Sequence, residues 1–174
     1  EVARDAQAQQ EAIDRAQAEA LKQAQEGALK ALKEKVARMK ERANELSKEE
    51  YRGYLQSLLD DAVKASDDLE RGLDQALLPE SIDAARRAEA SFGALERSLR
   101  SRARYSRSPQ QDEASRNKAR EGRELSHEAL EELKQAREAL EQAAERAQAQ
   151  EAARQEAARK AQQQGQQQGQ QQGQ

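Results

Sequence analysis

The chain has 174 residues, of which 36% are charged and only 2% are aromatic, and its formal net charge is −3 at pH 7. It contains no cysteine, so disulfide frameworks, thiol nucleophiles and cysteine-ligated zinc are excluded. General nucleic-acid binders are usually basic overall, and the slightly acidic balance argues against that class. Most of the hydrophobic residues are alanine, which favours close contact between helices over a thick globular core.

A first helix is predicted over residues 2–46, a stretch without proline. Its apolar residues from Leu29 to Leu46 are spaced alternately three and four residues apart, which is the heptad spacing of the contact face of a coiled coil. Towards the N-terminus the stripe thins to alanine, with Ile13 and Leu21 as its larger members. We therefore expect one helix whose outer half is lined by alanine.

A second helix is predicted over residues 48–78. Ser47 and Glu50 match the capping box that starts many helices, although no glycine or proline marks a break there. A heptad pattern continues beyond it, and Pro79 is expected to end the helix, because the residue before a proline avoids the helical conformation.

A third helix is predicted over residues 82–104, with Ser81 as its N-cap. Ser108 then caps a fourth helix over residues 109–161, with Pro109 at its first position. The remaining residues, 162–174, contain only glutamine and glycine, and we expect this low-complexity tail to be disordered.

The predicted fold is all-α: a long antiparallel helical hairpin, or coiled-coil arm, formed by residues 1–161 with its tip at Pro79–Ser81. Matching residues on the two arms support this assembly, because Val36 would lie level with Leu125 and Leu21 with Leu140. The alternative is a four-helix bundle, in which Ser47 and residues 106–109 are true turns.

The segment 97–109 holds five arginines and no acidic residue. In the hairpin, Arg97 and Arg100 would pair with Asp60 and Asp61. The other three arginines would face a stretch without acids and stay free to contact a phosphate or an acidic protein surface. These candidate partner contacts are Arg102, Arg104 and Arg107.

A second set of candidate partner contacts lies at the predicted hairpin tip. The acidic residues of the chain concentrate around this tip, so it would form a charged head at the end of a thin arm. The contacts assigned to it are Leu78, Glu80 and Ile82.

Catalysis has few suitable side chains in this sequence. His127 is the only histidine, and Glu124-x-x-His127 supplies only half of the ligand set of a di-iron helix bundle. No glycine-rich phosphate-binding motif can be found in the chain. We therefore expect no catalytic, cofactor-binding or metal-ligating residues, and no small-molecule substrate.

The sequence favours a non-enzymatic, elongated scaffold, spacer or protein-interaction module, with self-association or a protein partner. The alternative is electrostatic binding of nucleic acid or another polyanion through residues 97–107. A chain that begins at Glu1 is expected to be part of a longer protein, and arginine outnumbers lysine 20 to 10, which hints at a bacterial origin in the cytoplasm or the cell envelope. No apolar run reaches membrane-spanning length and no signal peptide is visible, so membrane contact is not expected within this segment.

Overall fold

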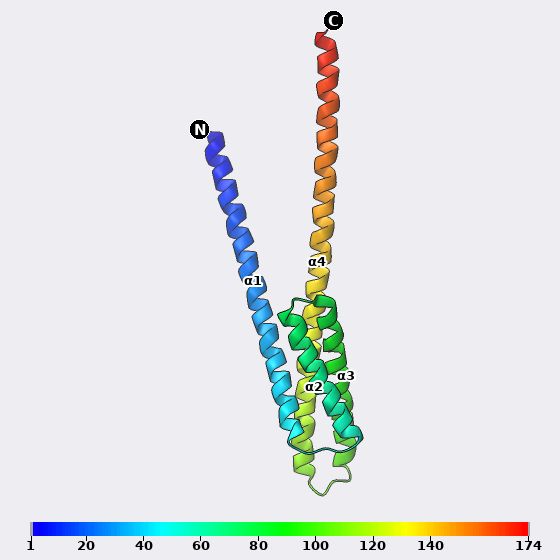
Figure 1. Ribbon diagram of the computed structural model, residues 1–174. Helices are drawn as coiled ribbons and strands as arrows, with labels where there is room; N and C mark the ends of the chain where they lie inside the picture. The colour runs from blue at the N-terminus through cyan, green and yellow to red at the C-terminus, as the bar shows by residue number, and fades with distance from the viewer. Residues whose placement is uncertain (1, 174) are drawn as a thin grey trace. The chain divides into compact units, whose positions relative to one another are not determined.

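The computed structural model describes residues 2–173 (Figure 1), with the side chains of residues 12, 13, 15, 16, 19–169 and 173. Every regular element in this range is a helix, which confirms the predicted all-α class. The helices are α1 (Val2–Ser47), α2 (Tyr54–Asp74), α3 (Leu78–Ala103) and α4 (Pro109–Gln172). Contacts divide the chain into two units, Glu1–Leu133 and Lys134–Gln174, and α4 runs through both.

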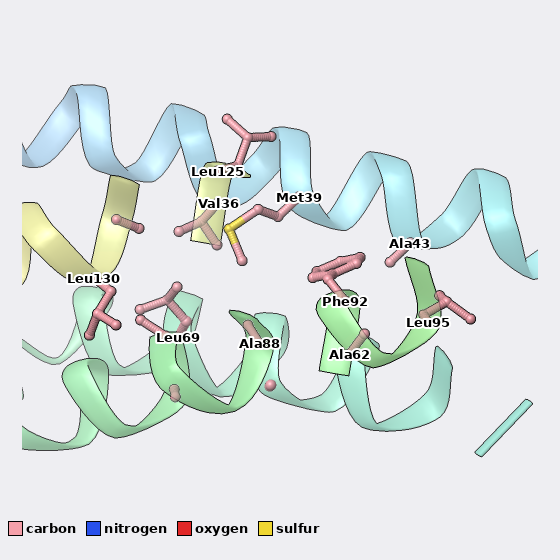
Figure 2. Packing of buried hydrophobic residues seen from close by; sticks show 14 of the residues in the cluster. Val36, Met39, Ala43, Ala62, Leu69, Ala88, Phe92, Leu95, Leu125 and Leu130 are labelled. Atoms are coloured by element: carbon pink, nitrogen blue, oxygen red, sulfur yellow. The ribbon is translucent and has the colours of Figure 1, made fainter. Parts of the chain in front are cut away.

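One hydrophobic core holds the first unit together, and all four helices contribute to it. Figure 2 shows Val36 and Met39 of α1 gathered with Leu69 of α2, Phe92 of α3 and Leu125 of α4. Burying a side chain of this size stabilises a fold by roughly 1.5–3 kcal/mol. The core therefore depends on a few large residues, with alanine filling the remaining contacts between helices.

A close contact in this core is made by α3 and α4 around Phe92. The ring is fully buried and covers Gly122, where a Cβ atom would lie 2.6 Å from the Cδ1 atom of the ring. Only glycine leaves room for the ring at this point. A single phenylalanine thus fills the contact between α3 and α4 in a core that is built mostly from aliphatic side chains.

The inner half of α1 runs antiparallel to α2, and this overturns the prediction of a straight hairpin arm. An unbroken arm would place Lys40 and Glu70 about 45 Å apart along its axis. Instead, the Lys40 Nζ atom lies 2.8 Å from the Glu70 Oε2 atom, and Lys33 pairs with Asp74 at 3.0 Å. The chain folds back between α1 and α2 because residues 48–53 leave the helical conformation.

The capping box predicted at Ser47 does not start a helix. The Ser47 hydroxyl donates instead to the Ala43 carbonyl, 2.9 Å away inside α1. The chain then turns through Glu50 and Gly53, which have φ angles of 50° and 61°. The left-handed conformation at these two residues makes the reversal, so α2 begins at Tyr54 and not at residue 48.

The turn between α2 and α3 lies at residues 75–77, before the predicted tip at Pro79–Ser81. The Leu77 N–H donates to the Gly72 carbonyl and Ala76 has a φ of 54°, as at a helix C-terminus closed by a left-handed residue. Pro79 then lies in the first turn of α3, where its missing N–H costs no hydrogen bond. Pro79 therefore helps to start a helix, whereas the sequence analysis expected it to end one.

The structure continues α4 to Gln172, so the expected disorder of residues 162–174 is not confirmed. Glutamine is a good helix former, and each helical glycine costs only about 1 kcal/mol relative to alanine. The described side chains of this stretch are exposed, so the helix there continues α4 without packing of its own. At the other end of α4, Pro109 is the first helical residue, as predicted.

Candidate functional site

The six predicted partner contacts lie at the two ends of α3 and do not form one surface. Leu78, Glu80 and Ile82 are in its first turns, whereas Arg102, Arg104 and Arg107 are at or beyond its end. A helix of 26 residues is about 39 Å long. The two groups are therefore considered separately.

The basic segment differs from its prediction at Arg102, which was expected to be free. Its Nε atom lies 4.0 Å from Oδ1 of Asp112, and its guanidinium lies over the ring of Tyr51, 5.7 Å from the ring centre. Contacts of this kind with an aromatic face are worth about 0.5–1 kcal/mol at an exposed site. Arg102 thus ties α3 to the loop before α2 and to the first turn of α4.

The predicted pairing of the other arginines with Asp60 and Asp61 is also wrong. Arg100 lies 3.6 Å from Glu96 on its own helix, and Asp60 accepts a hydrogen bond from Gln56. Residues 54–74 run antiparallel to α3, but the faces that carry these charges do not meet. The prediction used residue numbers to decide which residues lie at the same height along the two helices. Residue numbers do not show which way each side chain points around the helix axis.

Arg104 and Arg107 are exposed, and neither has an ion pair within residues 2–173. Arg107 lines a groove that contains both charges, because Glu49, Asp112 and Arg102 line it too. Tyr51 is another lining residue, and burial raises the pKa of its hydroxyl. The mixture of charges makes the groove a weak match for a strongly anionic ligand, while the two outer arginines remain accessible.

Two of the three residues assigned to the predicted tip belong to the hydrophobic core or pack against it. Ile82 is buried in the hydrophobic core and Leu78 packs against it, so both residues hold α3 in place. Glu80 is exposed, next to the exposed Leu77 in the turn. Of the three predicted contacts at this end, Glu80 is the one that a partner could reach without unfolding the helix.

His127, the only histidine, lies on the surface with its Nδ1 atom 3.0 Å from the Glu89 carboxylate. This contact joins α4 to α3, which are also linked by the ion pair of Arg123 with Glu96 at 2.8 Å. Across the part of the chain that the structure describes, no group of three or more acidic, histidine or cysteine side chains is arranged to hold a metal ion.

The outer parts of α1 and α4 each carry exposed large apolar residues. On α1, Ile13, Leu21 and Leu29 are 50%, 62% and 40% exposed. On α4, Leu140 is 59% exposed. Apolar side chains exposed along one face of a helix are a common mark of a docking surface. In the sequence, Ile13 and Leu21 belong to the thinner, alanine-rich stripe that precedes the heptad pattern of residues 29–46.

None of the helices in the described range is both long and apolar enough to cross a bilayer. Comparisons with protein families, with curated proteins and with solved structures found no match for this chain. The functional argument therefore depends on the residues themselves.

Proposed function

We propose that this chain is a non-enzymatic, elongated helical scaffold that binds protein partners through the exposed outer parts of α1 and α4. In this proposal the inner parts of the helices form a four-helix bundle that serves as a stable base. The observation that supports it most directly is the exposure of three large apolar side chains, Ile13, Leu21 and Leu29, in the outer part of α1.

The thermodynamics of helices support this function. An isolated helix in water gains little from propensity alone, and most helices in proteins are stabilised by packing an apolar face. The outer part of α1 carries large apolar side chains, Ile13, Leu21 and Leu29, and all three are exposed. Binding of a partner helix would bury the leucines and stabilise the extension in the same step.

Small-angle X-ray scattering on a size-exclusion peak, with the mass measured by light scattering, tests the scaffold proposal. Because α4 has 64 residues, an extended particle has a maximum dimension of at least about 96 Å. We expect this result together with a circular dichroism spectrum of a mainly helical chain. A compact particle of about half that dimension would contradict the scaffold function, because the extensions would then be folded away.

Polyanion binding is retained as a second candidate, because Arg104 and Arg107 are exposed without acidic partners. Fluorescence anisotropy with labelled single-stranded and duplex oligonucleotides at low salt would test it. Binding by these residues should weaken steeply with added salt and be lost in the double variant Arg104→Gln/Arg107→Gln. The matched control is Arg38→Gln/Arg86→Gln, which removes two exposed arginines elsewhere, and equal loss in both variants would exclude a specific site.

A further inference from the structure

The loop between α3 and α4 (Figure 1) consists of residues 104–108 and carries an aromatic side chain that is almost entirely exposed to solvent. Tyr105 is 89% exposed, against 40–68% for the other large hydrophobic residues that are exposed in the described range. Exposure of this degree leaves both faces of the ring open. Because aromatic rings gain energy by stacking, a ring presented in this way is available to a flat ligand.

The backbone around Tyr105 is held in place although its side chain is free. The Tyr105 N–H donates to the Arg102 carbonyl at 3.0 Å, at the end of α3. The Ser108 N–H donates to the Ser106 hydroxyl at 3.0 Å, and α4 starts directly afterwards at Pro109. A ring carried by a fixed backbone loses little conformational entropy when a ligand stacks on it. The loop therefore presents a preformed aromatic platform.

Positive charge flanks this platform. Arg104 and Arg107 lie in the same loop as Tyr105, are exposed, and have no ion pair within residues 2–173. Arg107 and Tyr105 also line the same groove. The surrounding segment 97–109 holds five arginines and no acidic residue, in a chain whose net charge is −3. Guanidinium groups bind phosphate oxygens in a bidentate geometry, so the ring and the two cations together match a flat base joined to phosphates.

The two carboxylates of the groove are already engaged by other groups of the chain. Asp112 is buried and lies 4.0 Å from Arg102, and Glu49 accepts a hydrogen bond from Gln111 at 2.6 Å. The Arg102 guanidinium also lies over the ring of Tyr51, so this ring is not open to a ligand. What remains free is the outer rim of the groove, with one open ring and two unpaired cations.

We propose that this rim binds single-stranded nucleic acid, with a base stacked on Tyr105 and backbone phosphates at Arg104 and Arg107. In a duplex the bases already stack on one another, so only an unpaired base can use the ring. This inference rests on the second candidate function, polyanion binding, and names the polyanion.

An anionic membrane surface would also attract the two arginines, but it matches the loop less well. Binding at a bilayer surface requires several large apolar side chains that enter the boundary between headgroups and acyl chains. Tyr105 is the only large hydrophobic residue among residues 104–108. One open ring beside two cations is sufficient for a stacked base with its phosphates and insufficient for insertion into a bilayer.

Fluorescence anisotropy of the full chain with labelled oligo(dT), a strand that forms no internal base pairs, tests the stacking. We expect tighter binding of the single strand than of the same strand annealed to oligo(dA). Tyr105→Ala should weaken single-strand binding by about 5- to 150-fold, the range that follows from the loss of one stacked base, and leave duplex binding unchanged. Tyr54→Ala is the matched control, because Tyr54 is 68% exposed on α2 and is not a lining residue of the groove.

Tyr105→Trp supplies a spectroscopic signal for the same contact. The natural chain has no tryptophan, so the indole emission of this variant reports on position 105 alone. The larger ring still stacks, and the variant should bind oligo(dT) at least as tightly as the natural chain. Its emission should fall on binding, because a stacked base quenches the indole, whereas the emission of Tyr54→Trp should not change.

The salt dependence separates the arginines from the ring. For single strands the logarithm of the binding constant falls with the logarithm of the salt concentration by about 0.7 for each phosphate contact. Arg107→Gln should therefore reduce this slope by about 0.7. Tyr105→Ala should weaken binding without changing the slope, because stacking releases no counterions.

Three results would overturn the single-strand site. They are equal affinity of Tyr105→Ala and the natural chain for oligo(dT), equal affinity of the natural chain for single strand and duplex, and binding only to vesicles of equal parts phosphatidylcholine and phosphatidylserine. If Arg104→Gln/Arg107→Gln loses binding and Tyr105→Ala does not, polyanion binding stands and the single-strand site alone fails. If neither oligonucleotide binds at low salt, both nucleic-acid proposals fail together.

Discussion

The inner and outer parts of α1 belong to one continuous helix and both carry large apolar side chains, yet these are buried only in the inner part. In the inner part, Val36, Met39 and Leu46 are almost completely buried, whereas Leu21 in the outer part is mostly exposed. Both parts are helical and both carry an apolar face. The difference arises because the inner part meets three other helices, and it shows that tertiary contact, not helix propensity, decides which apolar face becomes a core.

The charged residues of α1 show the same contrast. Lys35 and Arg42 reach carboxylates on α4, and Lys40 reaches α2. These contacts hold the pKa values of all three side chains above their ordinary values, mainly through hydrogen bonds to Glu132, Glu121 and Glu70. In the outer part, Lys22 and Glu26 have no ion pair among the described residues. These ion pairs between helices therefore lie in the part of α1 that packs against α2 and α4.

Phe92→Ala is expected to have the largest effect on the inner part. Removing the fully buried ring should lower the free energy of unfolding by about 3–5 kcal/mol, through lost burial and the cavity that remains. Urea unfolding followed by circular dichroism would measure the loss. A small effect would mean that the helices do not meet around this ring.

Gly122→Ala tests the same contact from the opposite helix. A Cβ atom 2.6 Å from the Phe92 ring should cost about 1–3 kcal/mol. The double variant Gly122→Ala/Phe92→Leu should recover part of that cost, because the smaller side chain leaves room for the added methyl group. Additive losses in the double variant would place Phe92 and Gly122 apart.

Truncating one leucine in each region compares the regions directly. Leu69→Ala, at a fully buried position, should cost about 2–5 kcal/mol. Leu140→Ala, at an exposed position of α4, should change the free energy of unfolding by less than about 0.5 kcal/mol in the dilute monomer. Matched denaturant titrations of the two variants check this, and equal costs would mean that Leu140 is covered in solution.

Much of the fold could be predicted from the sequence, because helix periodicity is a local property. The heptad steps identified the core residues Val36 and Met39, and the fourth helix begins at Pro109 as expected. The direction of the chain after each helix was harder to predict. It depends on left-handed residues such as Glu50 and Ala76, whose side chains give no strong signal for that conformation.

The candidate site was less predictable than the fold. Residue numbers place side chains level with one another, but they do not give the rotation of each helix about its axis. The sequence therefore assigned Ile82 to a contact surface although it lies in the core, and treated Arg102 as free although it lies against Tyr51. The pairing of these faces is fixed only when several helices pack together.

Replacing Gly72 or Gly27 by alanine should change the free energy of unfolding in opposite directions. At Gly72 a Cβ atom would lie 2.6 Å from the Ser81 hydroxyl and 3.3 Å from its backbone nitrogen, so Gly72→Ala should destabilise the inner part by about 1–3 kcal/mol. At Gly27 no atom lies within 4 Å, and Gly27→Ala should stabilise α1 by about 0.5–1 kcal/mol. Thermal unfolding of both variants measures the signs, and a stabilising Gly72→Ala would show that α2 and α3 are further apart.

Lys40→Met tests the ion pairs between α1 and α2. Lys40 contacts both Asp67 and Glu70, at 3.1 Å and 2.8 Å, and its loss should cost about 0.5–1 kcal/mol. The cost should shrink in high salt, because salt screens partly exposed charges. Lys64→Met, at an exposed position without an ion pair, is the control and should show no salt-dependent difference from the natural chain.

Ionisation of Tyr51 should slightly lower the stability of the fold in alkaline solution. Burial raises the pKa of its hydroxyl, so the folded state holds this proton more tightly than the unfolded chain, where the pKa is about 10. Once the pH rises above about 10, the unfolded state loses the proton first, and stability falls until the pH passes the folded pKa. The Tyr51→Phe variant has no hydroxyl to ionise, so its stability should not fall in this way. At neutral pH the variant should be at least as stable as the natural chain, because the buried hydroxyl has no partner at hydrogen-bond geometry in the described residues. The fall in stability above pH 10 should therefore appear in the natural chain alone, and a variant that is less stable than the natural chain at pH 7 would reveal a hydrogen bond that holds the loop against α4.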